Sequence, residues 1–61
     1  MDCDWIFLNL DGTKVEATLS ETAIPVPGDG KMHGGKGYRV RHVIDSRTTT
    51  PNPAVIATEH N

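Results

Sequence analysis

The sequence contains a single cysteine, Cys3, only three aromatic residues and no long apolar run. One cysteine excludes an internal disulfide bond, and the three histidines lack the regular spacing of a metal site. We therefore expect no metal and no cofactor. No window approaches the roughly 18 apolar residues of a transmembrane helix, and the first residues are acidic where a signal peptide would be basic. We expect a cytoplasmic protein without a membrane segment.

The short length also limits the hydrophobic core. A chain of 61 residues predicts one small domain, 1–61, and a domain of this size buries only about 60% of the surface that its unfolded chain exposes. With no disulfide and no metal expected, self-association is the remaining common source of stability. The net charge of -2 argues against general, salt-driven binding of nucleic acid, which we regard as a less favoured partner.

A β-hairpin is predicted for residues 4–20. Trp5 begins a short apolar run rich in strand-forming residues, and Asp11-Gly12 follows this run. This dipeptide favours a type I′ turn, in which both central residues have positive φ. After the turn, residues 14–20 alternate polar and apolar over the length of a strand.

The rest of the chain predicts more strands and turns. Pro25 and Pro27 allow only a short or edge strand before the glycine-rich segment, in which Ile24 and Val26 can still point inward. No segment has a helical apolar period. We therefore predict an all-β fold with little or no helix, as a curled antiparallel sheet or small barrel of four to five strands. The remaining segments are a glycine-rich hairpin loop (27–37), a strand (38–45), a turn (46–53), a strand (54–58) and a frayed tail (59–61).

The strand over 38–45 has imperfect alternation. If Tyr38 and Val40 face the core, strict alternation sends His42 inward and leaves Val43 outside. A β-bulge near His42 would bury Val43 instead, and we predict the bulge.

The glycine-rich segment partly fits a phosphate-binding loop. Residues 30–36 match the first seven positions of the pattern G-x-x-x-x-G-K. Gly37 stands where a magnesium-binding Ser or Thr belongs, and a strand pattern follows where a helix is needed. We therefore reject nucleotide hydrolysis and expect no catalytic residue. A nest of backbone N–H groups that binds an anion remains open beside a plain flexible loop.

Charge changes sign along the chain. Six carboxylates oppose one lysine before residue 31, giving -5, and five cations oppose two carboxylates from there on, giving +3. Arg39 and Arg41 alternate with apolar residues, so both should emerge on one sheet face. They either bind an anion or form an ordinary solvated face paired with Glu16 or Glu59. The candidate ligand-binding residues are Lys31, His33, Lys36, Arg39 and Arg41.

The first strand also suggests an interface. Residues 5–8 are all apolar, so alternation places large side chains on both faces of the strand, and a small sheet covers only one. The uncovered face, with Trp5 and Phe7 or with Ile6 and Leu8, is a candidate homodimer surface, for which we select Trp5 and Phe7.

The middle of the chain resembles short SH3-like β-barrel proteins of bacteria and phages. Residues 24–29 followed by residues 37–43 are similar to their pattern P-x-x-G-D, loop, G-x-x-Y-x-V-x-x-V, although Gly37 adjoins Tyr38 here and the loop is longer. The resemblance covers about a third of the chain. It implies a small barrel and no catalytic residues, and a phage origin would admit a counter-defence role.

These observations lead to one main hypothesis and two alternatives. The main hypothesis is a non-enzymatic, self-associating binding module that contacts an anionic partner through the glycine-rich loop and the basic strand. That partner would be a nucleotide-like ligand, a nucleic acid or an acidic protein surface. The first alternative is a structural or assembly subunit that uses the apolar Trp5 strand. The second is a phage protein that sequesters a host nucleotide signal.

Overall fold

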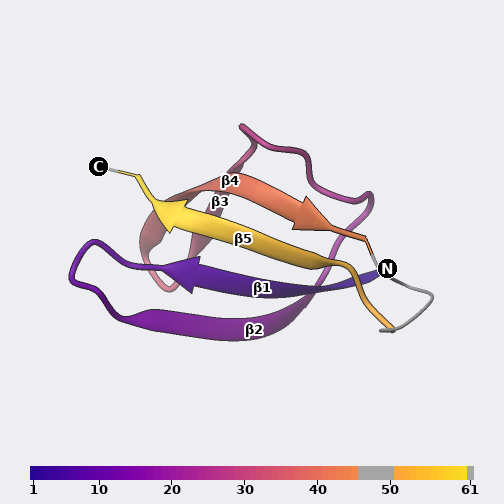
Figure 1. Ribbon diagram of the computed structural model, residues 1–61, viewed down its shortest axis with the longest axis horizontal. Coiled ribbons are helices and arrows are strands. Elements are labelled where there is room, and N and C mark those ends of the chain that lie inside the picture. The colour runs from indigo at the N-terminus through magenta and orange to yellow at the C-terminus, as the bar shows by residue number, and fades with distance from the viewer. Residues whose placement is uncertain (46–50, 61) are drawn as a thin grey trace.

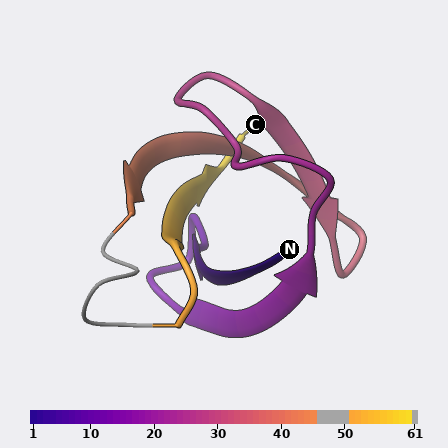
Figure 2. The ribbon, with the colours of Figure 1, turned by 90° about the vertical axis from the view of Figure 1, so that its right-hand side faces the viewer.

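The computed structural model describes residues 1–45 and 51–60, which form an all-β fold with no helix in this part of the chain. Its five strands form one sheet in the order β2-β1-β5-β4-β3. The sheet curls into a half-barrel (Figures 1 and 2). The strands are β1 (Asp2–Leu8), β2 (Lys14–Ser20), β3 (Gly30–His33), β4 (Lys36–Ile44) and β5 (Ala54–Glu59).

The sheet is mixed, which corrects the expectation of an antiparallel one. β1 and β2 form the predicted hairpin, and β5 pairs antiparallel with β4. However, β5 lies parallel to β1, with Ile6 opposite Ile56. This parallel pair joins the two ends of the chain at the centre of the sheet. β5 therefore has a hydrogen-bonded strand along each of its two edges, which fits its apolar sequence.

The turn between β1 and β2 differs from the predicted type I′ turn. Gly12 has a φ of 89°, but no non-glycine residue in the described part has positive φ, so Asp11 does not. The Gly12 N–H donates to Asn9 O at 3.1 Å, and the Asn9 N–H donates to Thr13 O at 2.8 Å. Asp11 is held by its side chain instead, because its Oδ1 accepts from the Thr13 N–H at 3.0 Å. The side-chain bond stabilises a five-residue loop in place of the two-residue turn.

We predicted one long loop over residues 27–37, but this segment contains a strand. Gly30–His33 form β3, which pairs with β4 across a two-residue turn. Gly34 and Gly35 have φ of 58° and 81°, the conformation required at both central positions of a type I′ turn. The sequence did not reveal β3 because its inward residues, Lys31 and His33, are polar and its apolar residue, Met32, is exposed.

The predicted bulge in β4 is confirmed. The register with β5 shifts between Val40 and His42, which leaves Arg41 as the extra residue. His42 is exposed and Val43 packs against the core. The extra residue therefore returns Val43 to the inner face, as expected for a bulge.

The core lies on the inner, concave face of the sheet. Trp5 and Phe7 are 1% and 0% exposed, so both contribute to this core. This burial corrects their assignment to an exposed interface, and Ile6 and Leu8 lie on the outer face. The expectation that Val26 can point inward is also wrong, because this side chain is exposed. The buried apolar residues are Cys3, Trp5, Phe7, Tyr38, Val40, Val55 and Ala57.

The ends of the predicted segments also change. Glu59, which we expected in a frayed tail, belongs to β5, and the His60 N–H donates to Gly37 O at 2.8 Å. Of the predicted turn 46–53, residues 46–50 lie outside the described residues, as does Asn61 of the tail. Pro53 is fully buried, and its carbonyl accepts from the Asp4 N–H at 2.8 Å.

Candidate functional site

The five predicted ligand-binding residues do not lie on one surface. Lys31 and His33 are opposite Tyr38 and Lys36 in the β3–β4 register, and Tyr38 is buried. Register partners point to the same face, so these side chains belong to the inner face or its rim. Arg39 and Arg41 are exposed on the outer face. A single contact running from Lys31 to Arg41 is therefore not assembled.

On the inner face, Lys31 and His33 pack on the aromatic core. The His33 ring stacks on Phe7 with a centroid distance of 4.6 Å and an interplanar angle of 8°. The Lys31 Nζ lies 5.2 Å from the centroid of the Trp5 ring. It also forms an ion pair of 2.8 Å with Glu21, just beyond the end of β2. Both side chains thus cover the core, a role that could not be inferred from the sequence because both are polar.

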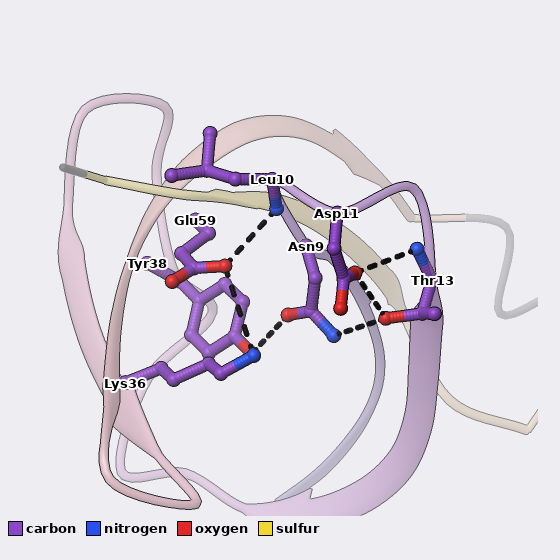
Figure 3. Close-up of polar contacts among 7 residues, drawn as sticks. All are labelled: Asn9, Leu10, Asp11, Thr13, Lys36, Tyr38 and Glu59. Atoms are coloured by element: carbon purple, nitrogen blue, oxygen red, sulfur yellow. Dashed lines mark hydrogen bonds and ion pairs between the residues drawn. The ribbon is translucent and has the colours of Figure 1, made fainter.

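Lys36 lies at one rim of the half-barrel, within a polar cluster (Figure 3). Its Nζ is 3.8 Å from Glu59 Oε1, and the same oxygen accepts from the Leu10 N–H at 3.0 Å. The buried Tyr38 donates its hydroxyl to Asn9 Oδ1 at 2.5 Å. These bonds tie the β1–β2 loop to β4 and β5, so Lys36 has a structural partner.

The carboxylates of Asp11 and Asp29 make local hydrogen bonds in their turns. Asp29 Oδ2 accepts from the Val26 N–H at 3.1 Å. Hydrogen bonds from the side chain and N–H of Thr13 lower the pKa of Asp11. Burial raises the pKa of the Cys3 thiol, with a further contribution from Glu21, so this cysteine is held in its unreactive form. Within residues 1–45 and 51–60, no group of His, Cys, Asp and Glu is arranged to hold a metal ion.

The outer face forms a grid of three rows across β2, β1, β5 and β4. The pairing registers give its rows as Thr18, Asp4, Ala54, Ile44; Glu16, Ile6, Ile56, His42; and Lys14, Leu8, Thr58, Arg39. The central strands β1 and β5 carry Ile6, Ile56 and Leu8 beside the polar Asp4 and Thr58. Leu8 is 39% exposed, and Ile44, at the end of β4, is 51% exposed. Asp4 and Glu16 lie on the β1–β2 side of the grid together with Lys14, and Arg39, Arg41 and His42 lie on the β4 side.

Arg39 and Arg41, the two arginines of β4, have no acidic partner among the described residues. Arg41, the bulge residue, donates from Nε to Thr58 Oγ1 at 2.8 Å. Both ion pairs found among the described residues use a lysine, Lys31 or Lys36. Neither arginine therefore pairs with Glu16 or Glu59 in the part of the chain that the structure describes. Their guanidinium groups remain available to an anion.

Two hollows lie on the outer face. One, of about 440 Å³, is lined by Asp4, Ile6, Glu16, Thr18 and Ala54 among others. The other, of about 300 Å³, lies over the β3–β4 hairpin and is lined by Gly30, Met32, Gly37, Arg39 and His60 among others. The first is acidic and the second is basic. The sequence did not predict either, because each collects residues far apart in the chain.

Comparisons with protein-family models, with curated proteins and with solved structures find no match for this chain. The described residues contain no helix of sufficient length and apolar character to cross a membrane.

Proposed function

We propose that this protein is a non-enzymatic binding module whose outer β4 face binds an anionic partner. The observation that carries the proposal is the exposure of Arg39 and Arg41 on one face, without an ion-pair partner in the described residues. Two guanidinium groups on one strand suit carboxylate or phosphate groups, which they can bind through paired N–H donors. The role proposed for β4 no longer requires Lys31, His33 or Lys36.

The proposal keeps the three anionic partners named from the sequence: a nucleotide-like ligand, a nucleic acid and an acidic protein surface. The basic hollow beside Arg39 suits a small anionic ligand, since Met32 is 71% exposed and offers an apolar wall. The β4 side of the grid, where Arg39 and Arg41 are both exposed, suits a protein surface. We place the protein in the cytoplasm and regard its relation to SH3-like barrels as part of the proposal, supported by the small curled sheet alone.

A second candidate function is an assembly subunit that uses β1. Trp5 and Phe7 are buried, so this contact would have to use the opposite side of the strand. Leu8 is 39% exposed there, and Ile6 and Ile56 lie side by side in the register. Exposed apolar side chains in one patch favour contact with another protein surface.

The test of the main proposal is a binding titration with three probes: ATP, a short single-stranded oligonucleotide and a poly-glutamate peptide. We expect at least one probe to bind, with an affinity that falls as salt is added. Arg39→Gln and Arg41→Gln should each weaken that binding several-fold.

Lys14→Gln is the matched control, because it removes one exposed cation from the same face on β2. It should change the affinity little. If no probe binds, or if the lysine and arginine variants lose affinity equally, the proposed role of β4 is wrong.

A further inference from the structure

We propose that the basic hollow beside Arg39 is a pocket for a nucleoside monophosphate, with the base over glycines of β3 and β4 and the phosphate at Arg39. The inference rests on the proposed function and selects one of its three anionic partners. The hollow has a volume of about 300 Å³, at the lower end of the range for small-molecule pockets. A mononucleotide fits this size, whereas a nucleic acid or a protein surface contacts a much larger area.

Two glycines occupy strand positions at which the fold does not require glycine. On the outer face, Gly30 of β3 lies opposite Arg39, and Gly37 of β4 lies opposite Met32. Neither glycine has a positive φ. A Cβ at Gly30 would meet no atom within 4 Å, and one at Gly37 would meet only the Met32 Sδ, at the ordinary contact distance of 3.5 Å. Glycine weakens a strand, so its presence where a side chain would fit indicates that another group approaches the backbone closely.

The bare backbone of these glycines forms a floor with side chains on either side. Met32 is 71% exposed and lies beside Gly37. On the other side of Gly37, the His60 N–H donates to Gly37 O at 2.8 Å, which places His60 just beyond the end of β5. A flat ring suits a floor without side chains, and a flexible thioether makes favourable contacts with an aromatic ring. The floor and Met32 therefore favour a nucleobase.

Arg39 and His60 supply hydrogen-bond donors for the phosphate. Arg39 is opposite Thr58 in the β4–β5 register, so His60, two residues further along, is its diagonal neighbour. Such neighbours are about 7–8 Å apart, a span that long side chains close. Arg39 forms no ion pair within the described residues, and both side chains are exposed. One phosphate group between them accepts from the imidazole and from the paired N–H donors of the guanidinium.

The first experiment is a calorimetric titration of the wild-type protein with AMP, adenosine and ribose 5-phosphate. AMP carries both the base and the phosphate, and each of the other probes carries only one of them. We expect AMP to bind about ten-fold more tightly than either fragment, or better, because only AMP contacts both the floor and Arg39. Equal affinity for AMP and either fragment, or no binding of AMP, would overturn the inference.

Filling the floor tests the pocket itself. Gly30→Val adds a β-branched side chain, so the protein should be no less stable in thermal unfolding while its affinity for AMP falls about ten-fold. Ser20→Val is the matched control, because it places the same residue on the outer face of the other edge strand, β2. It should leave the AMP affinity unchanged. Met32→Ser, at an exposed position, should weaken AMP binding several-fold and tests the pocket even where Gly30→Val fails to fold. Unchanged AMP affinity in the folded variants would reject the pocket.

Poly-glutamate separates this inference from the proposed function. Gly30→Val keeps both arginines of β4, so its affinity for poly-glutamate should equal that of wild type. Poly-glutamate binding that Arg39→Gln weakens, without any binding of AMP, rejects the pocket and leaves the general proposal standing. Arg39→Gln and Arg41→Gln variants that bind every probe as wild type does reject both.

Discussion

Lys31 of β3 and Glu21, which follows β2, form an ion pair of 2.8 Å across the two edge strands of the sheet. The same ammonium group lies over the Trp5 ring. The Lys31 and Glu21 side chains are only 26% and 16% exposed. This pair connects the ends of the curled sheet where no strand pairing is found between the described residues of β2 and β3, and it covers the largest core side chain.

Replacing Lys31 should separate its charge from its packing. Lys31→Met keeps an apolar stem over Trp5 and removes the ion pair, so we expect a loss of unfolding free energy of about 1 kcal/mol or less. Lys31→Ala also uncovers the ring and should cost more. Urea unfolding measures both, with Lys14→Met as an exposed control that should have no effect. Equal losses in Lys31→Met and Lys31→Ala would show that the charge dominates and that the cover over Trp5 contributes little.

The β3–β4 turn should be sensitive to a single methyl group. Gly35 has a φ of 81°, which L-residues rarely adopt, so Gly35→Ala should destabilise the protein by about 1 kcal/mol. Gly30 is the matched control, because its φ is not in this range and a Cβ there would meet open space. Gly30→Ala should be neutral or slightly stabilising. Thermal unfolding of the two variants compares them, and an equal loss in both would contradict the assigned turn.

Acid should weaken the fold through Asp4. Its carboxylate accepts hydrogen bonds from Asn52 Nδ2 at 3.1 Å and Thr18 Oγ1 at 2.8 Å, and these bonds lower its pKa. A lowered folded-state pKa contributes stability that is present above the ordinary value of 3.8 and is lost as the pH falls through the folded value. Asp11 contributes with the same sign.

Asp4→Asn removes one of these titrating groups, so its unfolding free energy should fall less steeply with acid below pH 3.8 than that of wild type. Urea unfolding across the acid range provides the comparison. An unchanged slope would mean that the hydrogen bonds of Asp4 do not favour its charged form.

The sequence predicted those parts of the fold that depend on local patterns. The hairpin of 4–20 follows from alternation and a turn signal, and the bulge follows from the conflict between Val40 and Val43 in one strand. The parallel pairing of β1 with β5 joins residues about fifty positions apart, with Ile6 opposite Ile56. No local pattern encodes that choice.

The candidate site was predicted only in part, for a related reason. Arg39 and Arg41 could be placed on one face because both lie on one strand. The inward position of Lys31 and His33 could be predicted only by recognising β3. That strand pairs with β4 because the chain reverses at Gly34 and Gly35. The Asp4–Glu16 hollow requires the register of two strands and the neighbouring Ala54. Sequence spacing carries none of this information.

The most direct test of a binding role for the outer β4 face is to map backbone amide shifts by NMR during titration with poly-glutamate. We predict that shifts concentrate on residues 39–42 and fade as salt is added, whereas Lys31 and His33, on the inner face, change little. Shifts concentrated on β3 or the rim at Lys36, with residues 39–42 unaffected, would contradict the account.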